Sequence, residues 1–93
     1  MQVYGLRDPR TGVIRYVGRT ATTLKHALWL NRHTPSNPAV GEWIKELERV
    51  GLGPETVLLD QSDDPNALRR VILQLRSEGV DLLNRRIPSW IRL

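Results

Sequence analysis

The chain has 93 residues, of which 40% are hydrophobic and 26% are charged, and we expect one globular domain over residues 1–93 with a single modest core. No apolar run approaches the roughly 20 residues that a membrane-spanning helix needs, and charged residues interrupt the N-terminus before the apolar part of a signal peptide could form. The lack of cysteine excludes disulfides, thiolate zinc sites and cysteine nucleophiles, and it favours a reducing, cytoplasmic location.

The net charge of +4 is distributed unevenly along the chain. Residues 1–35 carry a net charge of +5, residues 36–65 carry −5 and residues 66–93 carry +4. Folding of such a chain can gather a positive surface, and positive surfaces attract the phosphates of nucleic acids. A solvated, arginine-rich surface explains the same charges equally well, so charge alone leaves both interpretations open.

Two short strands are predicted at residues 3–6 and 13–17, joined by a turn that contains Asp, Pro, Thr and Gly. Alternation places Tyr4 on one face of the first strand, together with Leu6. The residues predicted to share one face of the second strand are Ile14, Tyr16 and Gly18. An antiparallel pairing can bring the two tyrosines together, although the sequence does not fix the register.

Two amphipathic helices are predicted after this hairpin. Thr22 or Thr23 can cap the first helix, and its inward stripe is Leu24, Ala27, Leu28 and Asn31. The second helix begins after an Asn37 cap, has proline at its first position and runs to about Val50. Its inward stripe is Val40, Trp43, Ile44 and Leu47.

A third strand at residues 56–59 and a third helix complete the prediction. The helix opens at residues 62–65 and ends near Gly79, and its inward stripe is Leu68, Val71, Ile72 and Leu75. Residues 80–83 are compatible with a final turn or a short strand. This order favours an α+β domain, in which helices pack on a small, mainly antiparallel, three-stranded sheet.

The tyrosines lie in a recognisable pattern. Val3-Tyr4, followed by Tyr16-Val17-Gly18 and Thr20, resembles the paired signature of the GIY-YIG nucleases, with Gln2 and Val3 where that family has Gly and Ile. The segments TLKHAL, NPAVGEWIKELERVGLGPETVLLD and EGVDLLN then follow the family's order over nearly the whole chain. The resemblance implies a single GIY-YIG-like domain, of a kind that suits a phage or a mobile element.

The resemblance also implies an activity, the metal-dependent hydrolysis of DNA phosphodiesters with Mg²⁺ or Mn²⁺. The tyrosine that matches Tyr4 helps to activate the attacking water, and the one that matches Tyr16 supports that hydroxyl group and the substrate phosphate. An arginine on the first helix and a metal-binding glutamate on the last helix offset the negative charge of the transition state. A phenol, with an ordinary pKa near 10, needs such a charged neighbourhood to act as a base at neutral pH.

Two of these four positions depart from the family pattern. Ala27 stands in place of the arginine and Leu68 in place of the glutamate, and no metal ligand is predicted, although Asp63 and Asp64 are weaker substitutes for the missing carboxylate. Loss of one such group commonly costs about 10²-fold or more in rate, so we expect impaired or absent cleavage. An engineered alanine and a natural loss of the chemistry both remain open.

A non-catalytic alternative uses the same fold to bind nucleic acid or a protein partner, for example as an inhibitor. The candidate nucleic-acid-binding residues are Arg19, Lys25, Arg32, Arg69, Arg70 and Asn84. Trp29 falls off the inward stripe of its helix, so it either packs under the loop at residues 33–38 or marks a contact surface. His26 and His33 are interpreted as surface residues because no third metal ligand accompanies them.

Overall fold

The structure, a computed structural model, describes residues 1–35 and 37–84; the predicted tail around Trp90 lies outside this part of the chain. Three strands, β1 (Gln2–Arg7), β2 (Ile14–Thr20) and β3 (Glu55–Gln61), form one antiparallel sheet in the order β2-β1-β3. The helices are α1 (Leu24–His33), α2 (Pro38–Arg49) and α3 (Ala67–Ser77). The predicted α+β class is therefore confirmed. Within the described ranges, none of the helices has the length and apolar character to span a bilayer.

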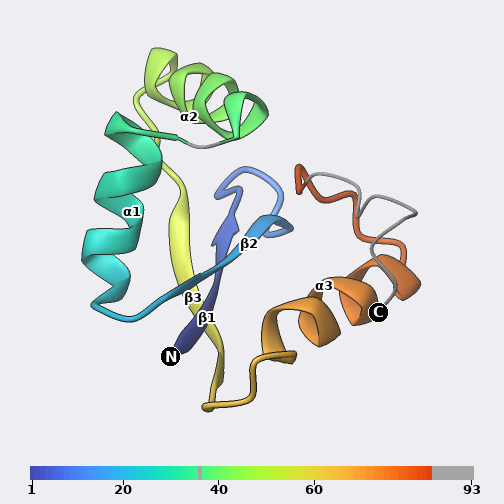
Figure 1. The fold of residues 1–93 in the computed structure, drawn as a ribbon. Helices are drawn as coiled ribbons and strands as arrows, with labels where there is room; N and C mark the ends of the chain where they lie inside the picture. The colour runs from blue at the N-terminus through green and yellow to red at the C-terminus, as the bar shows by residue number, and fades with distance from the viewer. Residues whose placement is uncertain (36, 85–93) are drawn as a thin grey trace.

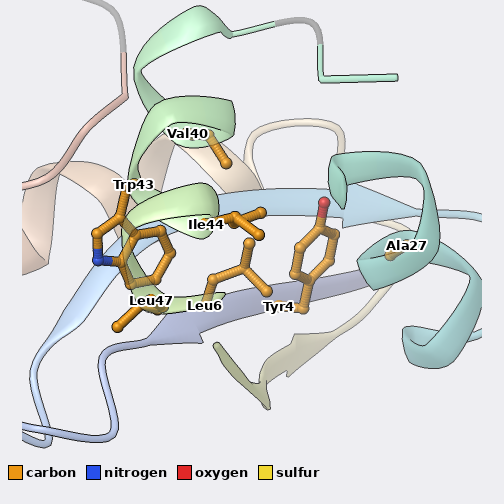
Figure 2. Close-up of a cluster of buried hydrophobic side chains, with 7 residues drawn as sticks. All are labelled: Tyr4, Leu6, Ala27, Val40, Trp43, Ile44 and Leu47. Atoms are coloured by element: carbon orange, nitrogen blue, oxygen red, sulfur yellow. The ribbon is translucent and has the colours of Figure 1, made fainter. Parts of the chain in front are cut away.

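Helices cover both faces of the sheet, with α1 and α2 on one side and α3 on the other (Figure 1). The larger buried cluster consists of Tyr4, Leu6, Ala27, Val40, Trp43, Ile44 and Leu47. Figure 2 shows Tyr4 and Ala27 at one end of this cluster and Trp43 at the other. The smaller cluster on the opposite face consists of Val3, Val17, Ala67 and Ile72. The central strand β1 thus supplies alternate residues to two cores, as its position between two helical layers requires.

Capping residues determine where α1 and α2 begin. The Thr23 hydroxyl accepts a hydrogen bond from the His26 amide at 3.1 Å, and the Asn37 side chain accepts one from the Ala39 amide at 3.0 Å. The third helix begins later than predicted, at Ala67, because Asp64 accepts a hydrogen bond from the Asn66 amide at 2.9 Å and residues 65–66 form a turn before the helix.

A β-bulge at Arg15 changes which face Ile14 occupies. Leu6 pairs with Tyr16, whereas Arg7 pairs with Ile14, so Arg15 is the extra residue. Ile14 therefore packs with the Val3 cluster beneath α3, and the prediction that it shares a face with Tyr16 is wrong. Gly5 makes room for it, because a Cβ atom there would lie 3.0 Å from Ile14 Cδ1.

Residues 80–84 follow α3 and run beside the free edge of β2 without forming a strand or turn of their own. The Leu83 amide donates to the Arg15 carbonyl at 2.6 Å, and the Arg15 guanidinium donates to the Asp81 carbonyl at 3.0 Å. The Asn37 side chain, from the start of α2, donates to the Leu83 carbonyl at 2.8 Å. These contacts tie the second strand, with Tyr16 in it, to both helical layers.

The loop between β1 and β2 is held by a buried carboxylate. Asp8 accepts hydrogen bonds from the Arg10 guanidinium at 2.9 Å and from the Trp43 indole N–H at 3.4 Å. The hydrogen bonds from Arg10 are the main reason that the pKa of Asp8 is lowered to about 2. The carboxylate therefore stays ionised at neutral pH and links the hairpin loop to α2.

Candidate functional site

Three of the four positions that the sequence predicts to be catalytic meet at one cavity, which we call the tyrosine pocket. It has a volume of about 260 Å³ and is lined by Tyr4, Tyr16, Arg19, Thr20, Ala27, Leu30, Asn31 and Thr34. These residues come from β1, β2 and α1, with Thr34 directly after α1, and α1 packs on the face of the sheet that carries Tyr4. The fourth position, Leu68, does not line this pocket.

The tyrosines meet diagonally, not directly across the hairpin. Tyr4 pairs with Gly18, and Tyr16 pairs with Leu6. A Cβ atom at Gly18 would lie 2.5 Å from the Tyr4 hydroxyl oxygen and 3.1 Å from Tyr16 Cε2. The glycine therefore gives the Tyr4 ring its place against β2, beside the second tyrosine.

Asn31 fixes the Tyr4 hydroxyl group. Its Nδ2 donates to the Tyr4 hydroxyl oxygen at 2.8 Å and to the Ala27 carbonyl at 2.8 Å. Since the Tyr4 oxygen accepts this bond, its own hydrogen remains available as a donor to a ligand. Sequence reasoning placed Asn31 on the inward stripe of α1 but did not name it as a site residue. In the sequence, the polar Asn31 on an otherwise apolar inward stripe could have indicated that it binds a buried group.

Both phenols are neutral at physiological pH. Burial raises the pKa of Tyr4 above its ordinary value, and the Asn31 hydrogen bond offsets only part of this effect. Burial also raises the pKa of Tyr16, and the nearby Tyr4 adds to the increase. The pair is therefore suited to donating hydrogen bonds to an anion and poorly suited to acting as a base.

Arg19 contributes an exposed side chain to the lining of the pocket. Within residues 1–35 and 37–84, its guanidinium group makes no hydrogen bond or ion pair. Two other candidate arginines are paired: Arg32 with Glu48 at 2.7 Å, and Arg70 with Asp64. Arg69 also has no ion-pair partner among the described residues, but it is partly buried on α3 and does not line the pocket. Arg19 is thus the candidate arginine that, among the described residues, lines the pocket and is free to bind an anion beside the tyrosines.

Leu68 packs against the Val3 cluster on the opposite face of the sheet. It lines a second cavity of about 200 Å³, together with Asp63 and Asp64, and Arg19 borders both this cavity and the tyrosine pocket. A leucine offers no metal donor, Asp63 pairs with the N-terminal amino group at 3.6 Å, and Asp64 pairs with Arg70. The residues present therefore do not fit the divalent ion that the family resemblance implies.

The remaining candidates lie outside the tyrosine pocket. The Asn84 side chain accepts a hydrogen bond from the Val17 amide at 2.9 Å and donates one to the Val17 carbonyl at 2.7 Å. These two bonds cover part of the outer edge of β2. Lys25 lines a separate hollow on α1, while Arg69 is partly buried on α3. Asn84 therefore supports the strand that carries Tyr16.

No protein-family model matches this chain, and searches of curated proteins and of solved structures likewise gave no match. The GIY-YIG resemblance therefore remains a hypothesis that rests on the sequence motifs.

Proposed function

We propose that this chain is a GIY-YIG-like domain that binds a backbone phosphate of DNA in the tyrosine pocket and has lost efficient hydrolysis. The observation that carries the proposal is the convergence of Tyr4, Tyr16 and Arg19 on one cavity. Two neutral hydroxyl donors and one guanidinium that has no ion-pair partner among the described residues suit a phosphate group, which accepts several hydrogen bonds and carries negative charge.

Impaired hydrolysis is the second part of the proposal. Ala27 leaves the pocket without a second guanidinium, and Leu68 supplies no carboxylate for a divalent cation. The raised pKa values of Tyr4 and Tyr16 disfavour the phenolate that a base would need. Binding without turnover is what these residues support.

A second candidate is a protein-binding or inhibitor module that makes no use of the pocket. The packing of Leu68 against the Val3 cluster favours it, because there the residue behaves as an ordinary core side chain. Complete absence of DNA binding at low salt would support this candidate over the first.

Substitution of Arg19 tests the proposed phosphate contact. We expect Arg19→Gln to weaken binding of a labelled DNA duplex about 10-fold at low salt, because a charge-assisted hydrogen bond is lost. The slope of log affinity against log salt should fall by about one, as one phosphate contact disappears. Fluorescence anisotropy over a range of salt concentrations measures both quantities.

Arg70→Gln is the matched control for this experiment. Arg70 is also an exposed arginine, but it is paired with Asp64 on α3 and does not line the tyrosine pocket. It should retain the affinity of the unmodified chain to within about 2-fold, because its guanidinium group is already paired with Asp64 and lies outside the pocket. Equal losses for the two variants would show that charge alone, and not the pocket, determines binding.

A further inference from the structure

The outer side of α1 carries a row of three aromatic rings. The ring centroids of His26 and Trp29 lie 6.1 Å apart with planes 5° from parallel, and those of Trp29 and His33 lie 4.7 Å apart at 38°. The spacings of three and four residues place these side chains along one side of the helix. Trp29 is 52% exposed, so its indole is not part of the core and is accessible to a ligand.

A hollow of about 360 Å³ opens beside this row and is lined by Thr23, Lys25, His26 and Trp29. None of these residues lines the tyrosine pocket, although both sites include residues of α1. The hollow is shallow and open to solvent on the outer side of α1. The hollow can therefore receive a planar group against the indole.

The charge around the hollow favours a nucleotide as the occupant. Helix α1 contains no acidic residue, and residues 1–35 as a whole carry a net charge of +5. In the part of the chain that the structure describes, the Lys25 ammonium group has no ion-pair partner. An aromatic surface beside a cation binds an unpaired base and its phosphate together, and stacking of one base on such a ring contributes about 1–3 kcal/mol.

We infer that Trp29 stacks on an unpaired nucleobase while Lys25 pairs with the phosphate of the same nucleotide. This inference rests on the proposed DNA binding at the tyrosine pocket and adds the class of substrate. The ligand is a nucleic acid with single-stranded character, such as a flap, a gap or a single strand.

Base stacking and phosphate contacts can be separated with two single-stranded DNA probes of equal length. One probe has normal bases, and the other lacks the bases along its centre. We expect Trp29→Leu to weaken binding of the normal strand about 10-fold and binding of the abasic strand less than about 2-fold. Trp29→Phe, which keeps an aromatic ring, should retain most of the affinity. Lys25→Gln should reduce the slope of log affinity against log salt by about 0.7 on both strands, as expected for the loss of one phosphate contact on single-stranded DNA.

The control is Leu73→Ala, which removes an exposed apolar side chain from α3 and should leave both affinities unchanged. Equal effects of Trp29→Leu on the two strands, or no effect on either, would overturn the inference. If Trp29→Leu leaves the affinity for both strands unchanged, the row of His26, Trp29 and His33 is better explained as a protein-binding surface. If Arg19→Gln still weakens binding while Trp29→Leu does not, the stacking inference fails and the proposed function stands. If the unmodified chain binds neither strand nor duplex at low salt, both fail.

Discussion

Combined substitution of Ala27→Arg and Leu68→Glu is expected to raise the rate of plasmid nicking, with Mg²⁺ or Mn²⁺ present, at least about 100-fold above that of the unmodified chain. Ala27 lines the tyrosine pocket, so a guanidinium group there would face both phenols. Position 68 packs on the opposite face of the sheet, but it lines a second cavity that meets the pocket at Arg19. The substitutions return the two charged groups at the places where the sequence departs from the family pattern.

The restored site should also show a characteristic pH dependence. Burial now raises the pKa values of Tyr4 and Tyr16, and a guanidinium group beside them favours the phenolate and lowers those values. Nicking by the double variant should therefore increase with pH as the phenolate fraction grows. Initial rates of conversion of supercoiled to nicked plasmid, measured over a range of pH, test this expectation.

Ala27→Arg combined with Leu73→Glu is the matched control. It adds the same two charges to the chain, but Leu73 is 45% exposed on α3 and lines neither cavity. It should nick no faster than Ala27→Arg alone. Equal activity in the two double variants, or rapid nicking by the unmodified chain, would contradict the assignment of positions 27 and 68.

Gly18→Ala is expected to lower the free energy of unfolding by about 2 kcal/mol, because overpacking of a buried site typically costs 1–3 kcal/mol. The new methyl group would lie 2.5 Å from the Tyr4 hydroxyl oxygen and 2.7 Å from Tyr4 Cζ. Tyr4 is 5% exposed, and Asn31 holds its hydroxyl group, so the ring cannot move without breaking that hydrogen bond. Denaturant unfolding, followed by circular dichroism, measures the change.

Gly53→Ala provides the comparison for this measurement. No heavy atom lies within 4 Å of a Cβ built at Gly53, and its φ is not positive. Substitution there should change the free energy of unfolding by less than about 0.5 kcal/mol, or stabilise the chain slightly by restricting its unfolded state. Similar losses for both glycine variants would show that the Tyr4–Gly18 contact is not the cause.

The sequence predicted the order of the elements because their local signals agree with the fold. The caps at Thr23 and Asn37 and the apolar stripes are local features, and all of them reappear in the structure. The bulge at Arg15 was not predictable, because alternation assumes a regular ladder and no residue type demands an extra residue there. The same limit explains the error at Ile14.

The placement of the candidate site residues was predicted in part, whereas their role stays a prediction. The sequence indicated that Tyr4, Tyr16 and Ala27 belong together, and the structure brings them to one pocket. The helical stripe indicates that Leu68 faces inward, but it does not show which of the two cores this residue enters. In the structure, α3 covers the face of the sheet opposite the tyrosines, so Leu68 packs there. Pairings such as Arg32 with Glu48 depend on how α1 meets α2, which is tertiary information.

The proposed function requires that a DNA phosphate binds between Tyr4 and Tyr16. The chain has two tyrosines, and both line the pocket, so a carbon-13 label at tyrosine Cζ gives two NMR signals that report on this site alone. If the phosphate binds there, both tyrosine signals should shift as DNA is added at low salt. The shifts should be smaller in Arg19→Gln. DNA binding that leaves both tyrosine signals unmoved would contradict the proposed function.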